Sequence, residues 1–133
     1  MSEKIYHNVF KPFDGTSVAK STTDSTTCEW LDVSGWTDKK ISWELDSSGS
    51  IDVDIDMLVS PKGYYELNNE ATVDTEDYET VNIVTAHTAA VMVSKDANDV
   101  PELGTPIRSA KFTVDNDDAS DAVSVTLWVE GWS

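Results

Sequence analysis

Apolar and polar residues alternate along most of the chain from residue 27 onward, and this alternation restricts the possible folds more than any other feature of the sequence. Residues 39–46, 51–59, 107–114 and 122–131 each carry most of their apolar side chains at every second position. A period of two is typical of β-strands with one buried face, whereas the spacing of an amphipathic helix is nearly absent. The chain is therefore expected to be built from strands.

Four shorter segments also have strand character, namely residues 5–10, 28–33, 80–85 and 89–94. Together with the longer segments they make about eight strands, separated by turn-forming residues at the short intervals expected of an antiparallel sandwich or barrel. The sequence therefore predicts an all-β protein, an antiparallel β-sandwich that is jelly-roll-like.

A β-hairpin is predicted within this sandwich. Residues 39–46 and 51–59 both alternate, and the Ser-Ser-Gly-Ser segment at 47–50 that joins them has the composition of a turn. We therefore expect these two strands to pair with each other.

The first 26 residues differ in composition from the rest. Few apolar side chains occur between residues 11 and 27, while ordering each residue costs about 1–2 kcal/mol. Residues 1–26 are thus expected to form an N-terminal strand and a Ser/Thr-rich arm ordered by contact with another subunit, and residues 27–133 a single sandwich domain. Four apolar residues are suited to adding a strand to a partner's sheet, or alternatively to pairing within their own sandwich: Ile5, Tyr6, Val9 and Phe10.

The chain is strongly acidic, with 9 Lys and Arg against 25 Asp and Glu and a formal net charge of −16 at pH 7. Such a surface repels phosphate backbones and anionic lipid, so we expect neither a nucleic-acid nor a membrane partner. The charge suits a salty medium or a protein displayed in many copies. Residues 1–4 lack the apolar segment of a signal peptide, and the single cysteine, Cys28, cannot form an intrachain disulfide. Synthesis in the cytoplasm is expected.

Few residues are suited to catalysis. The two histidines, His7 and His87, lie outside any nucleophile-elbow or metalloprotease motif. We therefore predict that the protein is not an enzyme and uses no cofactor.

Acidic clusters are the remaining candidates for a metal site, because Ca²⁺ takes about six to eight oxygen ligands. The best candidates share one loop: Asp115, Asp117, Asp118 and Asp121. This loop lacks the glycine and the bidentate glutamate of an EF-hand. Asp52, Asp54 and Asp56 are spaced about 7 Å apart on one strand face, too far to share an ion without neighbours. A solvated acidic face without a metal is the favoured interpretation.

Five tryptophans occur in the 133 residues, and their phase in the alternation separates them. Trp43 shares the apolar phase of its strand, whereas Trp128 lies on an otherwise polar strand face. Outward aromatic side chains are enriched at protein interfaces. We predict that Trp128, together with Trp132 and Trp30, contacts another subunit. The alternative is that the tryptophans form the stacking platform of a carbohydrate-binding module.

Five segments carry a resemblance to a known group of proteins. They read EWLDVSGW at 29–36, KKISWEL at 39–45, SGSIDVDI at 48–55, VSPKG at 59–63 and SVTLWVEG at 124–131. This order resembles the small β-sandwich accessory proteins of tailed bacteriophages and related viruses, in which W-x-D-V-S-G-W leads to a hairpin ending in S-P-x-G. The last segment is similar to their final strand.

The resemblance implies a non-enzymatic virion structural protein, a capsid decoration or cement protein that is often trimeric and sits on the outer shell. The implied partners are further copies of the chain and the major capsid protein. The implied location is the virion, after synthesis in the host cytoplasm. No catalytic residue is carried over, and a carbohydrate-binding module remains the alternative function.

Overall fold

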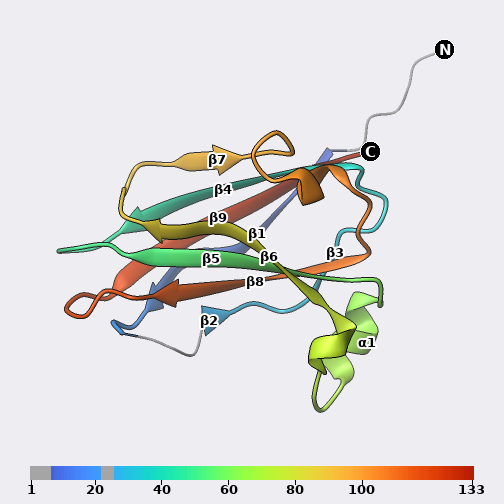
Figure 1. Cartoon of the computed structure of the whole chain (residues 1–133), viewed down its shortest axis with the longest axis horizontal. Helices are drawn as coiled ribbons and strands as arrows, with labels where there is room; N and C mark the ends of the chain where they lie inside the picture. The colour runs from blue at the N-terminus through green and yellow to red at the C-terminus, as the bar shows by residue number, and fades with distance from the viewer. Residues whose placement is uncertain (1–6, 22–25) are drawn as a thin grey trace.

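The computed structural model describes residues 7–21 and 26–133, which form two packed antiparallel sheets (Figure 1). The four-stranded sheet has the order β1 (His7–Val18), β9 (Val123–Trp132), β4 (Asp38–Asp46) and β7 (Val93–Lys95). The five-stranded sheet has the order β2 (Thr26–Thr27), β8 (Ser109–Asn116), β5 (Val53–Ser60) and β6 (Glu79–His87), and β3 (Leu31–Asp32) also pairs with β8. Three short helical segments connect strands: α1 (Tyr64–Asn69), η1 (Thr75–Asp77) and η2 (Pro101–Gly104).

The order of strands is that of a jelly roll. Both β2 and β3 pair with β8, so they occupy one strand position, and the described part of the chain has eight positions. The first position pairs with the eighth, the second with the seventh, the third with the sixth and the fourth with the fifth. These are the pairings of one long antiparallel hairpin rolled into two sheets. The predicted all-β, jelly-roll-like sandwich of about eight strands is therefore confirmed.

The hairpin predicted for residues 39–46 and 51–59 is wrong. Strand β4 pairs with β7 and β9, while β5 pairs with β6 and β8 in the opposite sheet. The two apolar faces, which include Trp43 and Ile55, both line the core between the sheets. Alternation fixes which side of a strand is buried, but it does not determine the neighbour with which that strand exchanges hydrogen bonds.

The prediction of an arm is corrected for residues 7–18, which form β1. This strand pairs with β9 along its whole length, with irregular register near Gly15, whose φ of 59° is left-handed. Phe13 and Val18 are 2% and 0% exposed, so the few apolar residues of the segment occupy core positions. Residues 7–18 thus pair within their own sandwich, which is the alternative stated for the N-terminal segment. Ile5 and Tyr6 lie outside the described residues.

Gly131 of β9 and Lys39 of β4 lie in tightly packed positions. Gly131 faces the indole of Trp36, and a Cβ built on Gly131 would overlap that ring. Lys39 lies in the inward phase of β4 and is 1% exposed, with its Nζ donating to the Thr105 carbonyl oxygen at 2.8 Å. In the described part of the chain, no helix has the length and apolar character needed to cross a membrane.

Candidate functional site

Two of the predicted contact residues lie on the outer face of the four-stranded sheet, the side turned away from the core. Trp128 and Trp132 alternate along β9 with fully buried residues such as Val129, and both are partly exposed. In the ladder, Trp128 stands beside Ser42 of β4, and Trp132 lies between His7 of β1 and Asp38 of β4. The period-two phase of β9 therefore identifies the outward tryptophans correctly.

Trp128 is held in its outward position by polar neighbours. The Nζ of Lys11 lies 5.5 Å from the centroid of the indole, a cation–π distance, and also pairs with Asp14 at 3.0 Å. On the other flank, the hydroxyls of Ser42 and Ser94 share a hydrogen bond of 2.8 Å. An aromatic ring supported on both sides is suited to packing against a second surface, and its role in a contact stays a prediction.

Trp132 is held by a different pair of residues. The imidazole of His7 stacks on the indole with 5.1 Å between centroids and 10° between planes. The Nε2 of His7 lies 3.0 Å from a carboxylate oxygen of Glu130, which fixes the imidazole. The three side chains form an ordered strip at the end of the sheet.

Trp30 does not join the other two tryptophans. It is 4% exposed and packs beside Tyr78, with 6.0 Å between ring centroids, while Lys111 of β8 lies 5.8 Å from its ring. The side chain of Asn68 accepts from the Trp30 N–H at 2.8 Å and donates to the Trp30 carbonyl at 3.0 Å. These bonds replace ladder bonds, so the strand predicted at 28–33 is reduced to β3, and the indole offers little surface to a partner.

The predicted N-terminal contact residues divide between the two sides of β1. Val9 is 44% exposed, next to Glu130 in the ladder. Phe10 is partly buried and packs against Trp36, with 5.4 Å between ring centroids. Of the two, Val9 is thus the residue presented to solvent.

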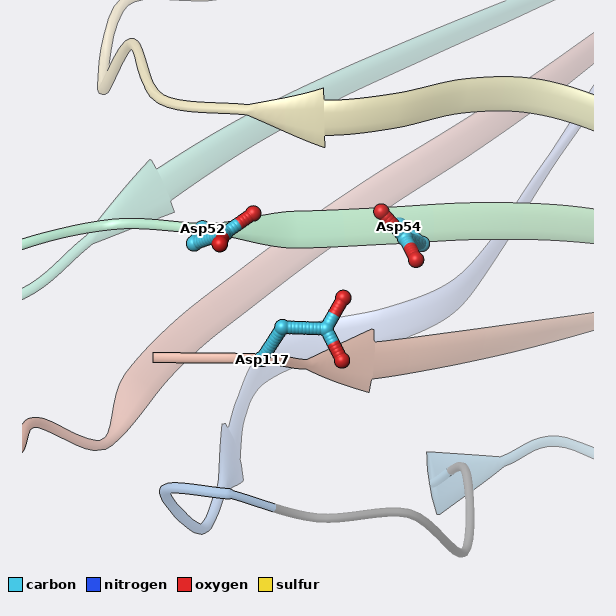
Figure 2. A group of neighbouring side chains, drawn as sticks. All are labelled: Asp52, Asp54 and Asp117. Atoms are coloured by element: carbon cyan, nitrogen blue, oxygen red, sulfur yellow. The ribbon is translucent and has the colours of Figure 1, made fainter. Parts of the chain in front are cut away.

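Three carboxylates meet at one end of the five-stranded sheet (Figure 2). Asp52 precedes β5, Asp54 lies on β5, and Asp117 follows β8, with one oxygen of each within 4.8 Å of the others. The Asp117 N–H donates to the Asp52 carbonyl at 2.8 Å, which brings its side chain beside Asp54. The spacing along the strand left Asp52 and Asp54 without a further carboxylate to share an ion, and Asp117 supplies it. Only the pairing of β5 with β8 reveals it, and the sequence carries no signal for that pairing.

Two other residues of the candidate calcium loop, Asp118 and Asp121, have structural roles. Asp118 Oδ1 accepts from the N–H groups of Ser120 and Asp121, at 2.9 and 2.8 Å. Asp121 Oδ2 accepts from the Ser50 N–H at 3.0 Å. Within residues 7–21 and 26–133, Asp117 is the one member of the predicted set that joins a group with metal-ligand spacing.

The carboxylate group holds a proton more readily than an isolated aspartate. A hydrogen bond with Asp54 raises the pKa of Asp117 above its usual value of 3.8, with further contributions from burial and from the charges of Asp54 and Asp52. Asp54 Oδ1 also accepts from the Ala86 N–H at 2.7 Å. Oxygens within 4.8 Å are compatible with a shared cation, because Ca²⁺ binds oxygens at about 2.3–2.6 Å. The group can therefore share a proton, or a cation can screen its charge.

We expect Asp117→Asn to raise the Tm by about 1–3 °C at pH 7, because the amide keeps a hydrogen bond to Asp54 and removes a charge. The effect is small since Asp117 is exposed and solvent screens it. The pKa of Asp117 is raised on folding, so protonated Asp117 stabilises the folded wild type below pH 3.8. This stabilisation is lost as the pH rises through the folded-state pKa of Asp117. Thermal melts with a chelator between pH 3 and 8 measure the difference.

The exposed Asp46→Asn is the matched control and should leave the pH profile unchanged. An Asp117→Asn profile parallel to the wild type would contradict the assignment. Repeating the melts in millimolar calcium distinguishes a shared proton from a bound cation. If the folded state binds calcium at this group, calcium should raise the Tm of the wild type and not that of Asp117→Asn.

The second histidine is half-buried at the end of β6. His87 packs edge-on against Trp43 with 5.4 Å between ring centroids, and burial lowers the pKa of its imidazole below the usual 6.5. The structure therefore places His7 and His87 in separate packing environments, each against a tryptophan.

The sequence matches no protein-family model and no curated protein. The fold is similar to that of VP2 in the subviral particle of infectious bursal disease virus, with 13% identity and a TM-score of 0.46 over 98% of this chain and 33% of that chain. It is also similar to a structure of the Gx strain of that virus, with 12% identity and a TM-score of 0.47 over 97% and 33%. The chain spans about one third of the length of these proteins.

Proposed function

We propose that this chain is a virion structural protein, a capsid decoration or cement protein that binds the outer shell and other copies of itself. The observation that carries the proposal is Trp128, an indole directed outward from a polar strand face and supported by Lys11. Such anchors are typical of interfaces. The motif order of residues 28–63 and 107–131, which resembles virion accessory proteins, supports the same function.

The proposed contact surface is the part of the outer face around Trp128, including Val9. Its apolar area is bordered by Lys11 and Glu130, so it has the apolar centre and polar rim of a specific interface. The remaining surface of a chain with a net charge of −16 repels other copies, which favours association through this one region. The proposed partners are two further copies in a homotrimer and the major capsid protein, and the proposed location is the virion.

We expect Trp128→Ala to convert the oligomer to monomers. A buried aromatic anchor contributes about 2 kcal/mol or more, which corresponds to a dissociation constant raised about 30-fold or more. Size-exclusion chromatography with light scattering over a dilution series measures the change. The fold should be retained, because the side chain lies outside the core.

Tyr65→Ala is the matched control, since Tyr65 is an aromatic residue on α1 that is 73% exposed. It should leave the mass unchanged. A wild type that is monomeric at every concentration, or a Trp128→Ala oligomer as stable as the wild type, would refute the proposed contact.

A further inference from the structure

A cavity of about 450 Å³ lies where β5 ends and where β6 and β8 begin, at the end of the sandwich that carries α1 in Figure 1. Its volume falls within the range of about 300–1,000 Å³ that is typical of ligand sites. The lining comes from three segments of the chain, within residues 59–61, 76–79 and 102–108. None of these segments belongs to the proposed contact surface around Trp128.

The floor of the cavity is apolar. Val59 and Ile107 are partly buried and pack against the hydrophobic core, so the floor is continuous with the interior of the sandwich. Pro61, Tyr78 and Pro106 add further apolar surface to the lining. Covering such surface with an apolar side chain of a partner is favourable, because it removes that surface from water.

Hydrogen bonds and an ion pair hold the walls of the cavity in place. The Ser60 hydroxyl donates to the Asp77 carbonyl at 2.6 Å, and the Lys62 ammonium pairs with the Asp77 carboxylate at 3.0 Å. On the side of η2, the buried Lys39 ammonium donates to the Thr105 carbonyl at 2.8 Å. A cavity with ordered walls loses little conformational entropy when it binds a partner.

Three exposed carboxylates border this cavity, those of Glu76 in η1, Glu79 in β6 and Glu102 in η2. Glu79 is the ladder partner of Val59, so both side chains leave the sheet on the same face. Within the described residues, none of the three carboxylates forms an ion pair. The border is therefore complementary to a ligand with positive charges and repels an anionic one.

Arg108 supplies hydrogen-bond donors to the same cavity. It is the single arginine of the chain and is exposed, and its guanidinium has no hydrogen bond or ion pair with the residues that the structure describes. A guanidinium has five N–H donors in one plane. The carbonyl oxygens of an extended peptide are suitable acceptors, so a peptide segment uses this lining more fully than a simple cation does.

We propose that this cavity binds a basic segment of a partner protein, in which an apolar side chain has Lys or Arg on both sides. The apolar side chain would pack on Val59 and Ile107, the flanking cations would pair with the glutamates, and Arg108 would donate to backbone carbonyl oxygens of the segment. No residue of this chain has a basic residue on both sides, so a second copy cannot supply the segment. The inference thus adds a partner surface beyond the proposed contact around Trp128.

The test titrates the full chain with two blocked peptides and follows its backbone amide shifts by NMR. The probe is acetyl-Gly-Lys-Leu-Lys-Gly-amide, and the matched control peptide has serine in place of leucine at the same net charge. We expect saturable shifts at the cavity residues. The serine peptide should bind about tenfold more weakly, because it leaves the apolar floor uncovered. This comparison leaves the protein unchanged, so it does not depend on the folding of a variant.

Variants of the chain test the charged groups of the lining. The double variant Glu79→Gln with Glu102→Gln should weaken binding of the leucine peptide about tenfold. Its matched control, Glu44→Gln with Asp46→Asn, removes the same charge from exposed positions of β4 outside the cavity and should have little effect. Arg108→Gln should weaken binding about threefold, although it makes the chain more negative, because the backbone carbonyl oxygens of the peptide lose their donors.

Absence of saturable binding by the leucine peptide at millimolar concentration would overturn the inference. Equal binding of the two peptides, or an equal loss in the β4 control, would also overturn it, because either result indicates nonspecific attraction to an acidic surface. Unchanged or tighter binding in Arg108→Gln would contradict the proposed peptide geometry. Because the oligomer test depends on Trp128 and this test on the cavity, either proposal can fail while the other stands.

Discussion

A chain that begins at Ser25 is expected to lose its cooperative thermal transition. This truncation removes β1, and with it the strand that pairs with β9 and the buried side chains of Phe13 and Val18. Loss of a buried Phe side chain alone typically costs about 3–5 kcal/mol, and a domain has about 5–15 kcal/mol in total. Differential scanning calorimetry and near-UV circular dichroism measure the loss of the transition.

Two point variants calibrate this result. Phe13→Ala should lower the Tm and keep a cooperative transition, whereas Asp14→Ala, at the next and exposed position, should leave it nearly unchanged. A truncated chain that melts cooperatively near the wild-type Tm would restore the interpretation of residues 7–18 as an arm.

Gly131→Ala is expected to destabilise the fold by about 3 kcal/mol, which is near the upper end of the usual cost of adding a group to a packed core. The Tm should fall by roughly 10 °C. The added Cβ would overlap the Trp36 indole, which Phe10 contacts. The backbone cannot retreat, because β9 is paired with β1 on one side and β4 on the other. Urea unfolding followed by circular dichroism measures the change.

The matched control is Gly63→Ala, whose Cβ would lie 3.2 Å from a guanidinium nitrogen of Arg108, the mobile end of a long side chain. It should have little effect. In the double variant Trp36→Ala with Gly131→Ala, the overlap is gone, so the loss should be smaller than the sum of the single losses. Strict additivity would contradict the overlap.

The alternation of apolar and polar residues was sufficient to assign the buried faces of the strands, because this pattern depends only on residues that are close in sequence. It placed Trp43 in the core and Trp128 outside it, as the structure shows. It also places Lys39 in the same inward phase as Ile41 and Trp43, despite the charge of the lysine. A charged residue in an apolar phase identifies a buried polar position.

Contacts between distant segments could not be predicted in this way. Trp30 packs beside Tyr78 and its backbone bonds to Asn68, both far along the chain. Asp117 meets Asp54 because β5 pairs with β8. The hairpin prediction failed for the same reason, since strands adjacent in sequence lie in different sheets. Local composition gives no information on these partners.

The pairing of β1 with β9 also determines the order in which the molecule can fold. The N–H of Gly15 donates to the hydroxyl of Thr126, 111 residues away, and β9 stands between β1 and β4. Neither neighbour can complete its hydrogen bonds before β9 arrives, so closure of a very long loop must precede formation of this sheet, and folding is expected to be slow. During that interval the edges of β1 and β4 are open to other chains. Mutual repulsion between chains that each carry a charge of −16 would then protect the unfinished molecules from aggregation.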